Sequence, residues 1–256
     1  MTAAPALTLE TYFSPEAEWY YIGSTQYKRF KACEARAMAV LRGEWQEEPS
    51  TALLVGSYVD AYFSGYIECF AAQHPEIFKR DGTLKKDYEY ANVIIRRIER
   101  EPLFMEALSG ERQSIMTGEI EGVPIKIKVD SLLPDRIVDL KIMHDLADRY
   151  NAEDFTWEPF WKAWGYDIQG AIYREIVRQN TGRTIPFGLA VATKEKPEPD
   201  ILLGEIPQAA LDTALEEVLS DIAYFDAIKK GFAEPARCEK CPYCRATKKL
   251  TGWVVL

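Results

Sequence analysis

Residues 118–141 read GEIEGVPIKIKVDSLLPDRIVDLK, and this alternating pattern constrains the fold more than any other part of the chain. Successive side chains of a β-strand point to opposite faces, so residues two apart share a face. In Val123–Asp130 the aliphatic residues therefore face one side, while Lys126, Lys128 and Asp130 face the other. One face of this strand is predicted to be buried and the other hydrated.

Two further strands are predicted to flank this one. Ser114–Ile120 forms the first, and Glu121-Gly122 is a two-residue connection of the kind that closes a hairpin, since Gly accepts a positive φ. The run Arg136–Ile142 places Asp139 and Lys141 on its polar face. We therefore expect an antiparallel meander of three strands.

The meander is expected to gather the carboxylates of Glu119, Asp130 and Asp139 around the Lys141 ammonium. Crowded carboxylates repel one another, and hard oxygen ligands without His point to Mg²⁺ or Mn²⁺. Such an ion could activate water against a phosphodiester, while Lys141 orients or deprotonates that water or neutralises charge on the phosphorus. An Asp-x-Lys pair alone would favour a surface ion pair, but Asp130, Glu119 and the strand pattern reverse this preference and favour a metal site.

A second candidate metal site lies near the C-terminus, in the sequence RCEKCPYCR. Cys238, Cys241 and Cys244 are spaced so that backbone turns can aim several thiolates at one metal, and Cys33 is the natural candidate for a fourth ligand. Cys69, in an apolar helical context, is expected to be a buried thiol. Metal binding by these four cysteines would stabilise the fold rather than serve redox chemistry.

Composition agrees with a folded protein built around one large core. The chain has 256 residues, of which 47% are hydrophobic, and a single domain is expected. No run approaches the roughly 18 apolar residues of a membrane span, and the N-terminus lacks a signal-peptide pattern, so we expect a cytoplasmic protein without membrane contact. The net charge of −9 argues against a protein that coats DNA through a globally basic surface. It leaves room for a local basic track, for which Lys126 and Lys128 are candidates.

The remaining periodicities complete an α/β chain with a helical N-terminal flank. Apolar residues at helical spacing predict helices, and alternating or continuous apolar runs predict strands. The expected helices are one from an N-cap at Ser24 to Leu41, then Ala52–Tyr66, Leu84–Ile98, Glu158–Gln179 with Trp164 on its buried side, and one starting at Pro207; the expected further strands are Pro186–Thr193 and Ile201–Ile206.

The order of these motifs resembles that of the PD-(D/E)xK nuclease superfamily, in its RecB/RecE-like branch, which includes phage proteins of the exodeoxyribonuclease VIII type. The resemblance assigns Asp130 and Asp139-Leu140-Lys141 to the central motif and Glu119 to an additional acidic position. It implies that Gly56–Asp60 is the first motif, with Asp60 as a metal ligand where many members have His. Gln169 and Tyr173, four residues apart on one helical face, correspond to the catalytic helix motif.

The resemblance also implies the fold and its division along the chain. We expect a restriction-endonuclease-like core, a mixed sheet with the antiparallel meander and flanking helices. Residues 1–256 would form one nuclease domain, with a helical flank over 1–110 that carries the first motif, a catalytic core over 111–206, and the last helix and cysteine cluster over 207–256. Some RecB-like nucleases hold a 4Fe-4S cluster with one Cys before the core and three after it, so the cysteines are expected to bind either iron-sulfur or zinc.

The function implied is that of a Mg²⁺- or Mn²⁺-dependent DNA exonuclease that resects linear duplex ends for phage-type recombination. Its partners would be double-stranded DNA ends, contacted by Lys126 and Lys128, and a single-strand annealing protein. A homo-oligomer is compatible with this function, since ring-forming exonucleases encircle DNA. Two alternatives are a single-strand or flap nuclease of the CRISPR-adaptation type and a catalytically silent DNA-binding scaffold.

Overall fold

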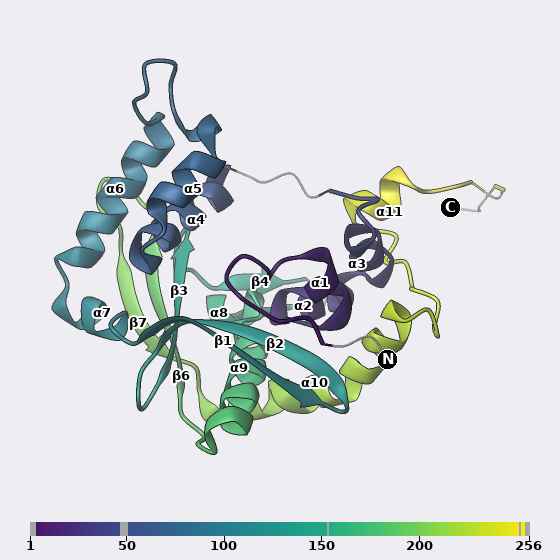
Figure 1. Cartoon of the computed structure of the whole chain (residues 1–256). Helices are drawn as coiled ribbons and strands as arrows, with labels where there is room; N and C mark the ends of the chain where they lie inside the picture. The colour runs from purple at the N-terminus through teal and green to yellow at the C-terminus, as the bar shows by residue number, and fades with distance from the viewer. Residues whose placement is uncertain (1–3, 47–50, 153, 251, 254–256) are drawn as a thin grey trace. The chain divides into compact units, whose positions relative to one another are not determined.

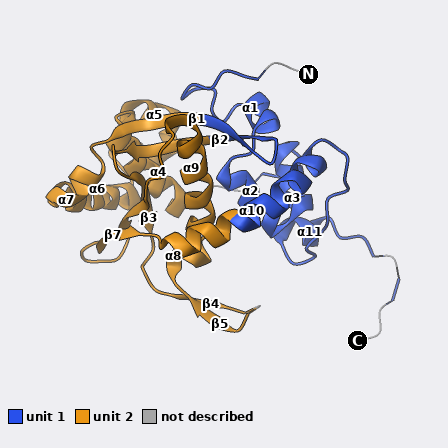
Figure 2. Ribbon diagram, turned by 90° about the horizontal axis from the view of Figure 1, so that it is seen from below, with its two compact units in different colours: residues 1–47, 117–126, 216–256 blue, residues 48–116, 127–215 orange. Residues whose placement is uncertain are grey.

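The computed structural model describes residues 4–46, 51–152, 154–250 and 252–253, and the chain divides into two compact units (Figures 1 and 2). Unit 1 contains residues 1–47, 117–126 and 216–256. Unit 2 contains residues 48–116 and 127–215. The single nuclease domain, with its expected divisions at residues 110 and 206, stays a prediction.

A five-stranded mixed sheet organises the fold, with strand order β1-β2-β3-β6-β7. The strands are β1 (Glu111–Ile120), β2 (Val123–Leu132), β3 (Ile137–Met143), β6 (Phe187–Thr193) and β7 (Ile201–Glu205). Strand β3 runs antiparallel to β2 and parallel to β6, which in turn is antiparallel to β7. The predicted α/β class with a mixed sheet is confirmed.

The sequence pattern placed the side chains of β2 and β3 correctly. Glu121 and Gly122 both have positive φ, of 49° and 71°, as the turn of a tight hairpin requires. Val123, Ile125, Ile127 and Val129 of β2 are buried, and Val138 and Leu140 of β3 belong to a hydrophobic core cluster. Their strand neighbours Asp139 and Lys141 consequently project from the opposite face.

Helices of unit 2 pack against this sheet. The core cluster joins β3 and β6 to α4 (Thr51–Ser64), α5 (Ile67–Gln73), the 3₁₀ turn Pro75–Ile77, α6 (Lys86–Glu99) and α7 (Pro102–Ala107). In Figure 1, α4 lies beside both α5 and α6, in agreement with the contacts that α4 makes with each of them. Two of these helices were expected from the sequence, whereas the short helices α5 and α7 were not.

The helix expected over Glu158–Gln179 is divided into α8 (Phe160–Ala163) and α9 (Tyr166–Thr181). The break falls at Gly165, whose φ of 62° and ψ of 38° are left-handed. Because the break changes the register, Trp164 is 53% exposed and the expectation that it is buried was wrong. Ahead of α8, β4 (Arg149–Asn151) and β5 (Thr156–Glu158) form a separate two-stranded sheet that the sequence pattern did not reveal.

Unit 1 contains α1 (Pro15–Tyr20), α2 (Ser24–Ala32), α3 (Glu34–Leu41), α11 (Pro242–Ala246) and most of α10 (Gln208–Lys229), which begins in unit 2. The single helix expected from Ser24 to Leu41 is interrupted at Cys33, whose φ of −173° and ψ of 108° are extended. The N-cap of α2 is Gly23 rather than Ser24. Across the described residues, no helix combines the length and apolar content needed to cross a membrane.

Candidate functional site

Asp139 and Lys141 form the centre of an acidic site in unit 2, which we call the acidic site together with Asp60 and Asp130. The Lys141 Nζ lies 2.5 Å from Asp139 Oδ2, and the Asp139 side chain is 3% exposed. The other carboxylate oxygen, Oδ1, accepts a hydrogen bond from Gln169 Nε2 at 2.6 Å. Burial disfavours the charged lysine, but the carboxylates of Asp139 and Asp130 outweigh it and raise the pKa of Lys141. The ammonium therefore stays charged beside Asp139.

Asp130 lies on β2, beside β3. Its Oδ2 accepts the backbone N–H of Leu140 at 2.9 Å, and its Oδ1 accepts Gln113 Nε2 at 3.3 Å. Burial, reinforced by the charges of Asp139 and Asp60, raises the pKa of Asp130 to about 8. Burial is the larger cause, and the two neighbouring carboxylates add to it despite the opposing charge of Lys141.

Asp60 is supplied by α4. The hydroxyl of Tyr66 donates to its Oδ2 at 3.2 Å, and that of Ser64 donates to its Oδ1 at 3.5 Å. Burial raises the pKa of Asp60, and the charge of Lys128 opposes that rise. A β-carbon added at Gly56, one turn before Asp60, would lie 3.7 Å from the Ile142 Cβ, so α4 passes close to β3 at this point.

Gln169 and Tyr173 act from α9, as their spacing of four residues predicts. Gln169 orients Asp139, whereas the Tyr173 hydroxyl donates to the backbone carbonyl of Lys128 at 3.0 Å and so fixes the strand that carries Asp130. Gly170 lets the helix approach the sheet, because a β-carbon there would lie 2.5 Å from Phe187 of β6. Helix α9 is thus held close enough to the sheet for the Gln169 side chain to reach Asp139 on β3.

Three residues that were predicted for the site are not part of the contacts described above. Glu119 is exposed and belongs to the part of β1 in unit 1, so its role as a ligand stays a prediction. Lys126, also in unit 1, is 2% exposed, with its ammonium 2.7 Å from Glu18 and bonded to the Tyr12 carbonyl. That cation is already neutralised within its unit. Lys128 remains partly exposed, and its charge acts on Asp60.

Sequence reasoning missed two residues that contact the acidic site, Gln113 and Tyr166. Gln113 lies eight residues before Glu121, as Asp130 lies eight after Gly122, so counting outward from the turn would have paired Gln113 with Asp130. Its φ of 51° is unusual for a non-glycine residue and is the kind of backbone strain found at functional sites. Tyr166 begins α9, and its ring centroid lies 5.0 Å from Lys141 Nζ. The glycine before it was the available signal for this helix start.

The donor set of the acidic site fits a hard divalent cation. Asp60, Asp130 and Asp139 offer only carboxylate oxygens, and burial, with repulsion from Asp139 adding to it, raises the pKa values of Asp60 and Asp130, so a bound cation would favour their charged forms. Lys141 supplies one positive charge against three carboxylates. These residues are therefore suited to bind Mg²⁺ or Mn²⁺.

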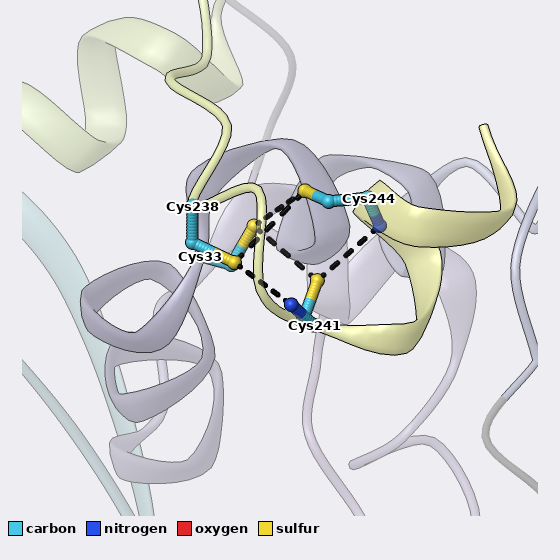
Figure 3. A group of neighbouring side chains, drawn as sticks. All are labelled: Cys33, Cys238, Cys241 and Cys244. Carbon is cyan, nitrogen blue, oxygen red and sulfur yellow. Dashed lines mark hydrogen bonds between the residues drawn. The ribbon is translucent and has the colours of Figure 1, made fainter. Parts of the chain in front are cut away.

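Four cysteines of unit 1 form a second cluster, and their sulfur atoms point toward one another (Figure 3). Cys33 comes from the break between α2 and α3, and the other three come from residues 238–244 around the start of α11. Cys33 Sγ lies 3.6 Å from Cys244 Sγ and 3.8 Å from Cys241 Sγ, and Cys238 Sγ lies 3.9 Å from Cys244 Sγ. The structure thus brings Cys33 together with the three C-terminal cysteines, as predicted.

Backbone amides support these sulfur atoms as thiolates. The N–H of Cys241 donates to Cys238 Sγ at 3.3 Å, and the N–H of Cys244 donates to Cys241 Sγ at 3.4 Å. Backbone hydrogen bonds lower the pKa of Cys238 to about 6, while burial raises that of Cys244 to about 12. Four neighbouring thiols cannot all ionise without a cation, so this arrangement suits a metal. Cys69 is exposed rather than buried as expected.

Comparison with known proteins assigns the family. Residues 23–247 match the family model described as "PDDEXK-like domain of unknown function (DUF3799)". The chain belongs to this family. A crystal structure from Eubacterium rectale, of a protein described as "Putative exonuclease", has 44% sequence identity over 98% of this chain and 97% of that chain, with a TM-score of 0.93. The predicted membership of the PD-(D/E)xK superfamily and its restriction-endonuclease-like fold is thereby confirmed.

A second solved structure is much less similar. The structure of SSO0001 is matched at 11% identity over 78% of this chain and 85% of that chain, with a TM-score of 0.31. Among curated proteins, no sequence matches this chain.

Proposed function

We propose that this protein is a metal-dependent DNA exonuclease. The observation that carries the proposal is the acidic site, in which a buried Asp139 lies 2.5 Å from a charged Lys141, next to Asp130 and with Asp60 close enough to shift the pKa of Asp130. Family membership and the 44% identity to the Eubacterium rectale protein described as an exonuclease support it. The presence of Glu119, Asp130, Asp139 and Lys141 together disfavours the silent scaffold.

The roles of the residues follow from their contacts. Asp130, Asp139 and Asp60 would hold a divalent ion, which when bound polarises the phosphodiester and lowers the pKa of a coordinated water. Gln169 keeps Asp139 in one orientation, and the backbone N–H of Leu140 does the same for Asp130. The Lys141 ammonium, positively charged beside Asp139, is positioned to neutralise negative charge that develops on the phosphate. Tyr173 acts as a positioning residue for β2.

The finer parts of the proposal rest on the family resemblance. We expect Mg²⁺ or Mn²⁺ as the ion, linear duplex ends as the substrate, and phage-type recombination with an annealing partner as the setting. A cytoplasmic location and a homo-oligomer stay predictions of the same kind.

The cysteine cluster is proposed to hold one tetrahedral metal ion, with zinc favoured. Four thiolates at about 2.3 Å from a single ion occupy the corners of a tetrahedron whose edges are about 3.8 Å. The Sγ–Sγ distances of 3.6–3.9 Å agree with that edge. In a cluster of four irons each thiolate binds a different iron, so the sulfur atoms would have to lie farther apart. Zinc bound here would link the N-terminal helices to the C-terminal segment within unit 1.

One experiment tests the proposed activity. End-labelled linear duplex and covalently closed circular DNA are incubated with Mg²⁺, Mn²⁺ or EDTA, together with the Asp139→Asn variant. Metal-dependent loss of the linear DNA, with closed circles spared and no cleavage by Asp139→Asn, is the expected result. Rapid cutting of closed circles would instead assign an endonuclease, and cleavage by the variant would remove Asp139 from the site.

A further inference from the structure

An unusual set of side chains lies on the segment of unit 2 that joins β3 to α9. Among the described residues of this segment, four large hydrophobic side chains are exposed and all four are aromatic: Tyr150 at 52%, Phe155 at 78%, Trp157 at 70% and Trp164 at 53%. We call them the exposed aromatic set. Apolar surface that is gathered in one region and left in water commonly marks a binding site.

Most of the set is carried by the β4–β5 hairpin. Tyr150 and Trp157 lie directly opposite each other on the two strands, with ring centroids 5.6 Å apart and planes inclined at 60°. The hairpin does not join the main sheet, and Figure 2 shows it projecting from unit 2 beyond α8. A two-stranded hairpin buries little surface of its own, so these rings contribute little to the core.

Both ends of the segment are attached to the acidic site. β3 ends at Met143, two residues after Lys141. At the other end, β4 contacts α8, α8 contacts α9, and α9 begins with Tyr166, whose ring centroid is 5.0 Å from Lys141 Nζ. Gln169, on the same helix, bonds to Asp139. The exposed aromatic set is therefore continuous along the chain with residues of the acidic site.

The charges of the segment indicate what it binds. Its two strongly basic residues are paired, Arg149 with Asp145 at 2.8 Å and Lys162 with Glu158 at 3.4 Å. Residues 144–165 carry five acidic residues against these two basic ones, so phosphate groups are repelled here and contacts to the bases are left as the means of binding nucleic acid. Flat aromatic rings, in contrast, stack on nucleic-acid bases with little dependence on sequence. Bases are accessible for stacking in a single strand, whereas in a duplex they are already stacked on one another.

We propose that the exposed aromatic set stacks on the bases of a single-stranded segment of DNA adjoining the acidic site. The proposal rests on the proposed nuclease function and deepens it, since it names the form of the substrate that lies next to the cleavage site. Trp157 and Trp164 are the main contacts, because indole offers the largest ring surface.

The test measures DNA binding in Ca²⁺, which prevents turnover, by fluorescence anisotropy. Each protein is titrated with a labelled oligothymidylate and with an abasic oligonucleotide of the same length, which keeps the phosphates but lacks bases. The variants are Trp157→Leu, Trp157→Phe and Trp164→Leu, with Trp253→Leu as a matched control at an exposed Trp in unit 1. Circular dichroism verifies that each variant is folded.

Loss of one stacked base should weaken binding of the oligothymidylate about 10-fold in Trp157→Leu and in Trp164→Leu, with no change for the abasic strand. Trp157→Phe should retain most of the affinity, because it keeps a flat ring, and Trp253→Leu should match the wild type. Equal losses on both strands, or none, would overturn the proposal. So would a wild-type oligomer, measured by light scattering, that Trp157→Leu dissociates without affecting DNA affinity, because the set would then be an interface between copies. If the wild type cleaves DNA and only the stacking result fails, the nuclease function stands; if it neither binds nor cleaves DNA, both proposals fall.

Discussion

Replacing Asp130 with Asn should stabilise the metal-free protein while it abolishes cleavage. Burial and the neighbouring charges of Asp139 and Asp60 raise the pKa of Asp130 to about 8, whereas an Asp in an unfolded chain titrates near about 3.9. Between about pH 4 and about pH 8 the folded state consequently binds more protons than the unfolded state, so the carboxyl lowers stability as the pH rises through this window. Asn does not titrate, so it does not lower stability in this pH window.

The magnitude follows from the same shift. Each pKa unit corresponds to about 1.4 kcal/mol, which sets an upper limit of about 4 kcal/mol at pH 7. Lys141 and Asp139 readjust to the new side chain, so we expect the free energy of unfolding to rise by about 1–3 kcal/mol. Asn can still accept the Leu140 N–H, and Gln113, whose Oε1 is buried without a hydrogen-bond partner, can turn its amide to accept the new N–H₂ group.

Urea unfolding in EDTA at a series of pH values measures this effect. The advantage of Asp130→Asn should be small near pH 4, grow toward pH 8 and then level off. Asp212→Asn is the control, because the pKa of the exposed Asp212 is shifted in the opposite direction: Arg174 lowers it. This substitution should not raise the free energy of unfolding. Added Mg²⁺ should stabilise the wild type more than Asp130→Asn. An Asp130→Asn protein that is less stable than the wild type at neutral pH in EDTA would refute this account of the acidic site.

Three other predictions concern separate residues. Lys141→Ala should lower turnover by about 100-fold or more with DNA affinity in Ca²⁺ unchanged, and Lys141→Arg should restore only part; a normal single-turnover rate would return Lys141 to a surface ion pair. Cys244→Ser should abolish stoichiometric zinc in elemental analysis and lower the thermal midpoint by about 6 °C or more, whereas Cys69→Ser should do neither; zinc-free wild-type protein of equal stability would contradict this. Burial lowers the pKa of Lys229 to about 7, so between about pH 7.5 and 9.5 the folded state binds fewer protons than the unfolded state. The free energy of unfolding should therefore rise by about 1 kcal/mol per pH unit in this range. Lys229→Met should lose this rise, and Lys230→Met should keep it.

The acidic site was predictable where it depends on strand alternation. A period of two residues is local, so the sequence alone placed Asp139 and Lys141 on one face and Val138 and Leu140 on the other. The two-residue turn at Glu121-Gly122 was readable for the same reason, since only a few residue pairs accept two positive φ values. Asp60 and Gln169 needed the family resemblance, because nothing local shows which helix faces which strand.

The failures have physical causes as well. Helical periodicity continues across Cys33 and Gly165, and a pattern of apolar residues cannot show that the backbone becomes extended at one and left-handed at the other. The exposure of Trp164 follows directly from the second break. Lys126 was assigned to a hydrated face because alternation gives the direction of a side chain and not what covers it; α1 supplies Glu18 as its partner.

These breaks fall where polar side chains or thiols have to be aimed at a site. The extended backbone at Cys33 ends α2 and starts α3, and it places a thiol 3.6 Å from Cys244. The left-handed Gly165 ends α8 and starts α9, so that Tyr166 lies over Lys141 and Gln169 reaches Asp139. The strained φ of Gln113 accompanies a contact with Asp130. An uninterrupted helix through either break would continue the buried stripe and turn these side chains away, so the interruptions that defeat sequence periodicity are the same ones that assemble the acidic site and the cysteine cluster.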